Sequence, residues 1–274
     1  MSGSLVRKRH RALVLGVLRS GGPLTKADIA RRLGLSVPTI TQILRDFERE
    51  GAVVPMGAGR SSGGRRPMLY RLRTDGLRAI GVSIDPDRIS AVVSDLSGAI
   101  AAETGTEIDL DEGEEAFESA LTRIVDDLLV ALGPAASLAG IGVAAPAMMR
   151  RSQGGVFLPI GRPDWTGVDL LAALGKRFHL PVVAENRAHA VGVGEYLFGA
   201  GQGTSDLLCL MIGSGLGAAI LTDGHLFTGG DGAAGAIGRM IVDTTGDEGA
   251  RTAGDLVGAY GIVRSALTRL RTDG

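Results

Sequence analysis

The sequence predicts a winged helix-turn-helix over residues 1–78 and a separate α/β domain over residues 79–274. In the first part, apolar residues recur at helical spacing and are followed by a hairpin rich in Gly and Arg. In the second part, strand-like and helix-like segments alternate, as in an α/β layer architecture. The charge changes at the same boundary. Residues 1–78 hold 16 Lys and Arg against 5 Asp and Glu, a net +11, whereas residues 79–274 hold 13 against 25, a net −12.

The spacing of apolar residues and the presence of capping residues predict the first two helices. Apolar residues from Leu5 to Leu18 follow helical spacing, and Ser-Gly-Gly-Pro at 20–23 ends that segment. Thr25 is expected to cap a second, short helix, because Asp28 stands three residues later, as in a capping box with Asp in place of Glu.

A third helix is expected after a turn at Gly34. Ser36 can cap it, Pro38 suits its first turn, and apolar residues recur through it at helical spacing. Two helices joined by such a turn form a helix-turn-helix, whose second helix enters the DNA major groove. The residues expected to reach base edges or phosphates are Thr25, Ser36, Val37, Thr39, Thr41, Gln42 and Arg45.

The hairpin that follows is expected to be the wing. Strands at 53–54 and 68–72 enclose a polar segment at 57–66, where glycine lets the backbone approach a duplex. Three helices and a hairpin could also form a protein-binding module, but turn, wing and positive charge together favour double-stranded DNA. The wing residues expected to contact phosphates or the minor groove are Arg60, Arg65 and Arg66.

The α/β domain is expected to contain two lobes, a first at about 79–200 and a partial second at about 201–274. The second lobe begins like the first, but it has fewer elements. In the first lobe, strands are expected at 79–85, 88–94, 98–103, 138–144 and 182–184, and helices at 113–131, 168–178 and 186–197. In the second, strands are expected at 207–212, 216–222 and near 241, and a single helix at 253–270.

Composition excludes several classes of protein. Cys209 is the one cysteine, so the chain cannot form an internal disulfide framework or a cysteine zinc cluster. No apolar stretch approaches the roughly 20 residues that span a bilayer, and the basic N-terminus is not followed by a signal sequence. A cytoplasmic location without membrane contact is therefore expected.

Several short motifs carry a resemblance to a known family. They are Gly64–Pro67, Gly81–Asp85, Asp95–Gly98, Gly140–Pro146, Pro163–Trp165, Pro181–Asn186, Gly213–Gly217 and Gly235–Gly238. In order and spacing they resemble the ROK family of repressors and sugar kinases. The resemblance implies an actin-like, sugar-kinase-like (ribonuclease H-like) fold of two lobes. The resemblance also implies that the cleft between the lobes binds a sugar, and that this ligand or a partner sets the affinity for DNA.

The chain departs from the kinases of that family where their chemistry resides. Family kinases use an Asp after Glu-Asn as the base, and this chain has Arg187, which cannot accept a proton at neutral pH. Where the family has a sugar-binding Glu and a zinc-binding His, this chain has Ala236 and Arg239. His189 stands where the family has its second Asn, and the segment 243–251 lacks the cysteines of the family's zinc loop. We therefore expect no catalytic residue, no cofactor and no metal.

A ligand pocket is expected around Asn186, the one sugar contact of the family that is retained. Asn186 could equally serve only as a helix cap. Arg187, His189 and Arg239 place positive charge in the cleft, so an anionic effector such as a sugar phosphate is one hypothesis, and a ligandless pocket is the alternative. The glycine turn 213–217 could cradle phosphates, or its glycines could serve close packing alone.

The sequence thus predicts a sequence-specific DNA-binding regulator, most simply a repressor controlled by a sugar or sugar-derived effector. A homodimer or higher homo-oligomer is expected, because paired modules on a palindromic operator bind DNA more tightly than one module. Two alternatives remain: a sugar kinase with an accessory DNA-binding domain, and a ligandless scaffold for protein interactions.

Overall fold

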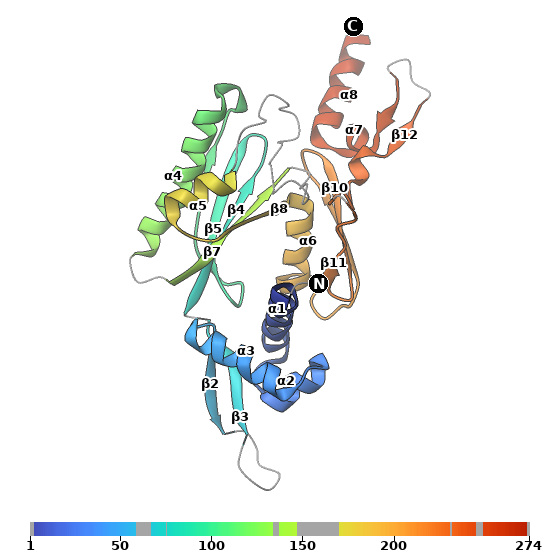
Figure 1. Cartoon of the computed structure of the whole chain (residues 1–274). Helices are drawn as coiled ribbons and strands as arrows, with labels where there is room; N and C mark the ends of the chain where they lie inside the picture. The colour runs from blue at the N-terminus through green and yellow to red at the C-terminus, as the bar shows by residue number, and fades with distance from the viewer. Residues whose placement is uncertain are drawn as a thin grey trace. The chain divides into compact units, whose positions relative to one another are not determined.

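The structure is a computed structural model of the chain, and it describes residues 3–58, 67–74, 76–133, 137–146, 170–230, 232–244 and 249–272. Figure 1 labels its helices and strands. The chain divides into two compact units. One comprises Met1–Ile80, Val92–Glu103 and Asp127–Gly140, and the other Gly81–Ala91, Thr104–Asp126 and Ile141–Gly274. Within the described ranges no helix has the length and apolarity needed to cross a membrane.

The N-terminal part contains the predicted helices and hairpin. Strand β1 was not predicted from the sequence, because two residues are too few for an alternating pattern to be recognised. It pairs antiparallel with β3, which gives a three-stranded sheet of order β1-β3-β2. The elements are α1 Gly3–Gly21, β1 Leu24–Thr25, α2 Lys26–Leu33, α3 Val37–Arg49, β2 Val53–Ala58 and β3 Met68–Leu72.

Both predicted helix caps are confirmed. The Thr25 hydroxyl accepts the N–H of Asp28 at 3.1 Å, and the Asp28 carboxylate accepts the N–H of Thr25 at 3.4 Å, which completes the capping box of α2. The Ser36 hydroxyl accepts the N–H of Thr39 at 3.3 Å at the start of α3. Between the two helices, Gly34 has a φ of 61°, a left-handed conformation that glycine adopts without steric cost.

Apolar side chains from the three helices and from β2 and β3 form one core. The inner face of α3 contributes four of its buried side chains, and among them Phe47 is only 2% exposed. The other buried apolar residues of α3 are Ile40, Ile43 and Leu44.

The next part of the chain forms a five-stranded sheet of order β6-β5-β4-β7-β8. Strands β7 and β8 are parallel, so their carboxyl ends lie at the same edge of the sheet. The strands are β4 Leu77–Ile84, β5 Arg88–Asp95, β6 Ile100–Glu107, β7 Ser137–Ala145 and β8 Val182–Asn186. The helical elements in this stretch are the 3-10 turn η1 Leu110–Glu112, α4 Glu114–Leu132 and α5 Leu170–Phe178.

A second, antiparallel sheet has the order β11-β10-β9 and follows helix α6. Helix α6 packs closely on this sheet, because a Cβ on Gly192 would lie only 2.2 Å from that of Ala219. The elements are α6 Arg187–Phe198, β9 Leu207–Ile212, β10 Leu216–Thr222, β11 His225–Leu226, the 3-10 turn η3 Ile237–Arg239, β12 Ile241–Asp243, β13 Arg251–Thr252, α7 Ala253–Val257 and α8 Ala259–Thr272.

The single helix predicted over 253–270 is wrong, because the chain forms two helices there. Gly258 separates them with φ −69° and ψ 152°, an extended conformation that ends α7. A Cβ at Gly258 would lie 2.9 Å from the carbonyl oxygen of Ser214, and the N–H of Ala259 donates to the carbonyl of Gly213 at 2.9 Å. Tertiary packing against the β9–β10 turn therefore overrides the helical pattern of the sequence.

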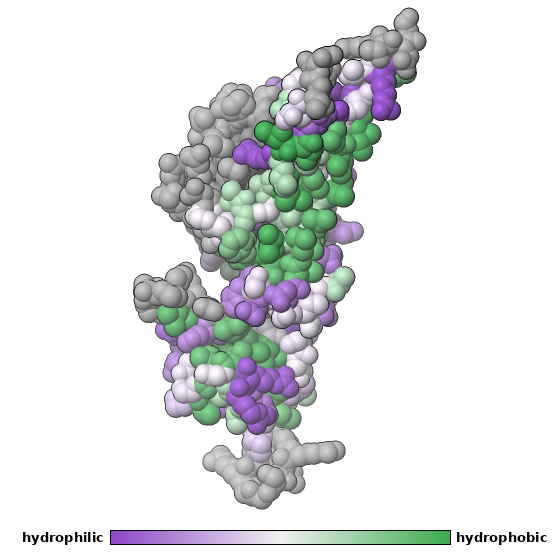
Figure 2. Space-filling view, turned by 90° about the vertical axis from the view of Figure 1, so that its right-hand side faces the viewer, coloured by the Kyte–Doolittle hydropathy of each residue, from purple (hydrophilic) through white to green (hydrophobic). Residues whose placement is uncertain are grey.

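The face of β9 that does not contact α6 is apolar and exposed. Side chains alternate along the strand, and the outward row consists of Leu208, Leu210 and Ile212, which are 63%, 55% and 63% exposed. Figure 2 shows hydrophobic side chains gathered over this region. We refer to these three residues as the β9 face.

Candidate functional site

The exposed side of α3 carries the side chains that the sequence assigned to DNA. Val37, Gln42 and Arg45 are exposed, and Thr41 is half-buried. The Ser36 and Thr39 hydroxyls lie 2.8 Å apart and bond to each other, so both take part in the helix cap. The hydroxyl of Thr25 likewise bonds Asp28 at 2.7 Å. The wing arginines Arg60, Arg65 and Arg66 lie outside the described residues.

A buried carboxylate, not anticipated from the sequence, lies beneath this face. Asp46 is 5% exposed and accepts hydrogen bonds from three side chains. Arg7 of α1 bonds it at 2.5 Å, Gln42 at 3.1 Å, and Arg49 completes the set. The Arg7 guanidinium is the main cause that lowers the pKa of Asp46 below its usual value. Asp46 therefore joins the first helix to the third.

This carboxylate makes the stability of the winged helix depend on pH. The folded-state pKa of Asp46 lies below its unfolded value, so its stabilisation is complete above the unfolded pKa, about 3.9, and is lost as pH falls through the folded pKa. Asp46→Asn should lower the melting temperature at pH 7, and the difference from wild type should shrink as pH falls through the lowered pKa of Asp46. Thermal melts across pH measure this; Glu48→Gln, at an exposed position of the same helix, is the matched control. If Asp46→Asn melted below wild type by the same amount at neutral and at acidic pH, this prediction would be wrong.

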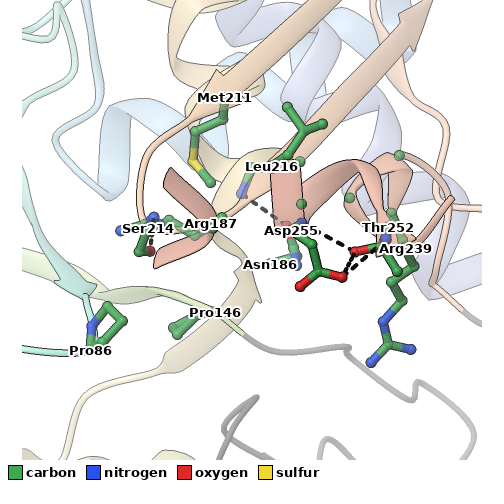
Figure 3. A pocket seen from close by; sticks show the side chains of 18 of the residues that line it. Pro86, Pro146, Asn186, Arg187, Met211, Ser214, Leu216, Arg239, Thr252 and Asp255 are labelled. Atoms are coloured by element: carbon green, nitrogen blue, oxygen red, sulfur yellow. Dashed lines mark hydrogen bonds between the residues drawn. The ribbon is translucent and has the colours of Figure 1, made fainter. Parts of the chain in front are cut away.

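The second candidate site is a pocket of about 860 Å³ near the start of α6. Asn186, Arg187 and Arg239 line it, together with the β9–β10 turn, η3 and the start of α7. In Figure 3, Arg187 lies beside Ser214, whereas Arg239 lies apart from them, near Thr252. The structure thus brings three of the four predicted ligand residues to one pocket.

Arg187 is held by its neighbours. Its guanidinium forms an ion pair with Asp85 just after β4, and it donates to the Ser214 hydroxyl at 3.4 Å. Burial lowers the pKa of the guanidinium, and its Nε has no hydrogen-bond partner among the described residues. The charge of Arg187 is therefore already neutralised by a carboxylate of the same chain.

His189, the fourth predicted ligand residue, does not line the pocket. It is 2% exposed, its Nε2 donates to the carbonyl of Ala234 at 2.8 Å, and its Nδ1 lies 3.2 Å from a Glu185 oxygen. Its side chain therefore joins α6 to the loop before η3. Asn186 is the N-cap of α6, because its side-chain oxygen accepts the N–H groups of Ala188 and His189 at 2.9 and 3.4 Å.

Close packing explains the glycines of the 235–238 motif. A Cβ at Gly235, which has φ 78°, would lie 2.0 Å from the carbonyl oxygen of Ala218, and one at Gly238 would lie 2.3 Å from that of Leu216. In the β9–β10 turn, the N–H of Gly213 already donates to the carbonyl of Gly215 at 2.9 Å. That amide is therefore engaged inside the turn.

The remaining charges of the pocket are mixed in sign. Arg264 donates to Asp255 at 2.8 Å, and Arg239 is exposed at the rim. Sequence reasoning missed three carboxylates that also line the pocket, because they lie in turns without a motif. Asp87 follows β4, Asp109 precedes η1, and Asp111 lies within η1. Among the residues that the structure describes, no cluster of three or more His, Cys, Asp or Glu could hold a metal ion.

Comparison with known proteins places both parts of the chain. A ROK family model matches residues 79–253, and a model of winged helix-turn-helix DNA-binding matches residues 2–54. The xylose repressor of Caldicellulosiruptor bescii is 30% identical over 89% of this chain and 61% of its own length. The DNA-binding transcriptional dual regulator NagC of Escherichia coli K12 is 27% identical over 89% and 60%. The chain thus spans about three fifths of these relatives.

Solved structures agree with the fold. A ROK family transcriptional regulator, a homologue of the E. coli MLC protein, superposes with a TM-score of 0.78 at 19% identity over 98% of this chain and 69% of its own. A ROK family glucokinase from Streptomyces griseus, in complex with glucose and AMPPNP, has a TM-score of 0.61 at 29% identity over 71% and 62%. The predicted winged helix and sugar-kinase-like fold are therefore confirmed.

Proposed function

Because the chain belongs to the ROK family and begins with a winged helix-turn-helix, we propose that it is a DNA-binding transcriptional repressor that responds to a sugar. One observation carries the proposal. The capped helix α3 presents Val37, Gln42 and Arg45 to solvent in a helix-turn-helix whose relatives are repressors. We place the boundary between the DNA-binding and sugar-kinase-like domains near residue 78. A homodimer on double-stranded DNA fits the paired half-sites that such modules bind.

We further propose that the sugar-kinase-like domain does not catalyse phosphoryl transfer. Transfer to a sugar hydroxyl requires a group that accepts its proton, and the position that holds this base in family kinases is Arg187. The ion pair of Arg187 with Asp85 adds a second obstacle, because it leaves Asp85 already engaged by a cation of the same chain. The pocket therefore serves recognition rather than chemistry.

The pocket favours a neutral, hydroxyl-bearing sugar over a sugar phosphate. Arg187 and Arg264 are both paired with carboxylates, so neither offers an uncompensated charge to an anion. The carboxylates Asp87 and Asp109 would repel a phosphate but accept hydrogen bonds from hydroxyl groups. Asn186 and Arg239 are the proposed direct contacts, and His189 is proposed only as a support for α6.

Selection of binding sites from random DNA with the purified chain tests the proposal. We expect a palindromic consensus, bound at least about 10³-fold more tightly than random DNA, and release when a neutral sugar from a panel is added. The same release assay with a panel of sugar phosphates is the comparison that tests whether the effector is neutral. Binding without sequence preference, or ATP-dependent phosphorylation of any sugar in the panel, would reject the repressor assignment.

A further inference from the structure

The hydrogen bond between Gln42 and Asp46 assigns the orientation of an amide on the exposed side of α3. An ionised carboxylate can only accept hydrogen bonds, so the group of Gln42 that lies 3.1 Å from the Asp46 oxygen is the amide nitrogen. The amide is planar, and its oxygen therefore points away from Asp46. Because Gln42 is exposed, this oxygen is available to a ligand.

Asp46 is itself held firmly enough to impose that orientation. One oxygen of Asp46 accepts a hydrogen bond from Arg7 at 2.5 Å. The other oxygen accepts hydrogen bonds from both Gln42 and Arg49. Helices α1 and α3 thus both anchor the carboxylate, which is 5% exposed. A buried, doubly paired acceptor cannot rotate to offer Gln42 a different partner.

In the major groove, the amide orientation decides which base edge matches. Adenine presents an N6 amine that donates and an N7 that accepts, and a glutamine amide can pair with both at once. With its oxygen outward, Gln42 accepts from the amine, and its second N–H remains for N7. A base that presents a carbonyl at the same place would face the amide oxygen with another acceptor, which is repulsive.

We propose that Asp46 is a positioning residue for DNA recognition, which fixes the amide of Gln42 so that it reads an adenine in the operator. The proposal rests on the repressor function proposed above and adds the residue pair that sets one base preference. Asp46 does not touch the DNA. It acts by removing the flipped amide orientation, in which Gln42 would instead donate to a carbonyl oxygen.

Operators with modified bases test the proposal. Replacing adenine by hypoxanthine changes the N6 amine to a carbonyl oxygen, so at one adenine the wild-type affinity should fall about 10-fold. Gln42→Ala should abolish this sensitivity at that adenine only. Asp46→Asn should reduce it to within about 3-fold, because the freed amide can rotate and donate to the carbonyl.

The matched control is Arg7→Gln, which removes the ion pair to Asp46 but leaves the bond between Gln42 and Asp46. It should reduce the melting temperature and retain the full adenine preference. Loss of the preference in Arg7→Gln to the same extent as in Asp46→Asn would overturn the proposal, because Asp46 would then act only through stability. Full preference in Asp46→Asn would overturn it as well.

A measurement on the unmodified chain does not depend on whether Asp46→Asn folds. In the NMR spectrum, one side-chain amide hydrogen of Gln42 should show a small temperature coefficient typical of a hydrogen bond, and the other should behave as solvent-exposed. Two solvent-exposed hydrogens would overturn the proposal. Selection of a consensus that contains no adenine dependent on Gln42 would overturn this inference alone, whereas selection of no consensus would reject the repressor function too.

Discussion

Replacing Phe47 by alanine should unfold the winged helix-turn-helix at lower denaturant concentration and with it remove specific DNA binding. The ring is 2% exposed inside the N-terminal core, and truncating such a residue costs about 3–5 kcal/mol in free energy of unfolding. The Arg11 guanidinium, 4.4 Å from the ring centroid, also loses its contact with the ring. This loss is a large fraction of the total stability of a typical domain.

Urea unfolding monitored through hydrogen exchange in peptides from α1–α3 measures this effect on the N-terminal part by itself. The control is Val130→Ala on α4, where the side chain is 82% exposed and the change should stay within about 0.5 kcal/mol. A loss of protection below about 1 kcal/mol in Phe47→Ala would mean that the core does not depend on this ring.

Replacing Arg45 by alanine should weaken operator binding without affecting the fold. Arg45 is exposed on α3, so the melting temperature should hardly change. Loss of a base contact would reduce affinity by about 5- to 150-fold and relax the preference at one position. Loss of a phosphate contact would weaken binding to all sequences alike, and the slope of log affinity against log salt concentration would become shallower by about one.

Fluorescence anisotropy over a range of salt concentrations separates these two outcomes. Arg123→Ala, which removes an exposed arginine from α4, provides the same change in net charge at a site outside the helix-turn-helix. Unchanged affinity in Arg45→Ala would remove Arg45 from the recognition surface. An equal loss in Arg123→Ala would indicate that only the total charge matters.

Much of the fold follows from local signals in the sequence. The caps Thr25 and Ser36 are short polar residues placed directly before apolar periodic segments, and the structure uses both as such. The two-residue strands β1 and β11 are not recognisable locally, because they exist only through their pairing partners. The break at Gly258 likewise depends on the distant β9–β10 turn, which no local pattern reveals.

The candidate site was only partly accessible to the same reasoning. Motif positions indicated Asn186, Arg187 and Arg239, and all three line the pocket. The orientation of His189 was not accessible, because α6 has small or apolar residues on every side and its periodicity does not identify the inner face. The pair of Gln42 and Asp46 has the i,i+4 spacing of helix neighbours, a signal that was present in the sequence.

The ion pair between Arg187 and Asp85 also constrains how this pocket can evolve. A single Arg187→Asp substitution would introduce the residue type of the family's base, but it would also remove the cation that pairs with Asp85. Asp85 would then lose its present partner, and a second carboxylate on the same side of the pocket would raise the cost of ionising both groups. A substitution at either position therefore changes the cost of a substitution at the other, and we expect the two positions to be epistatic.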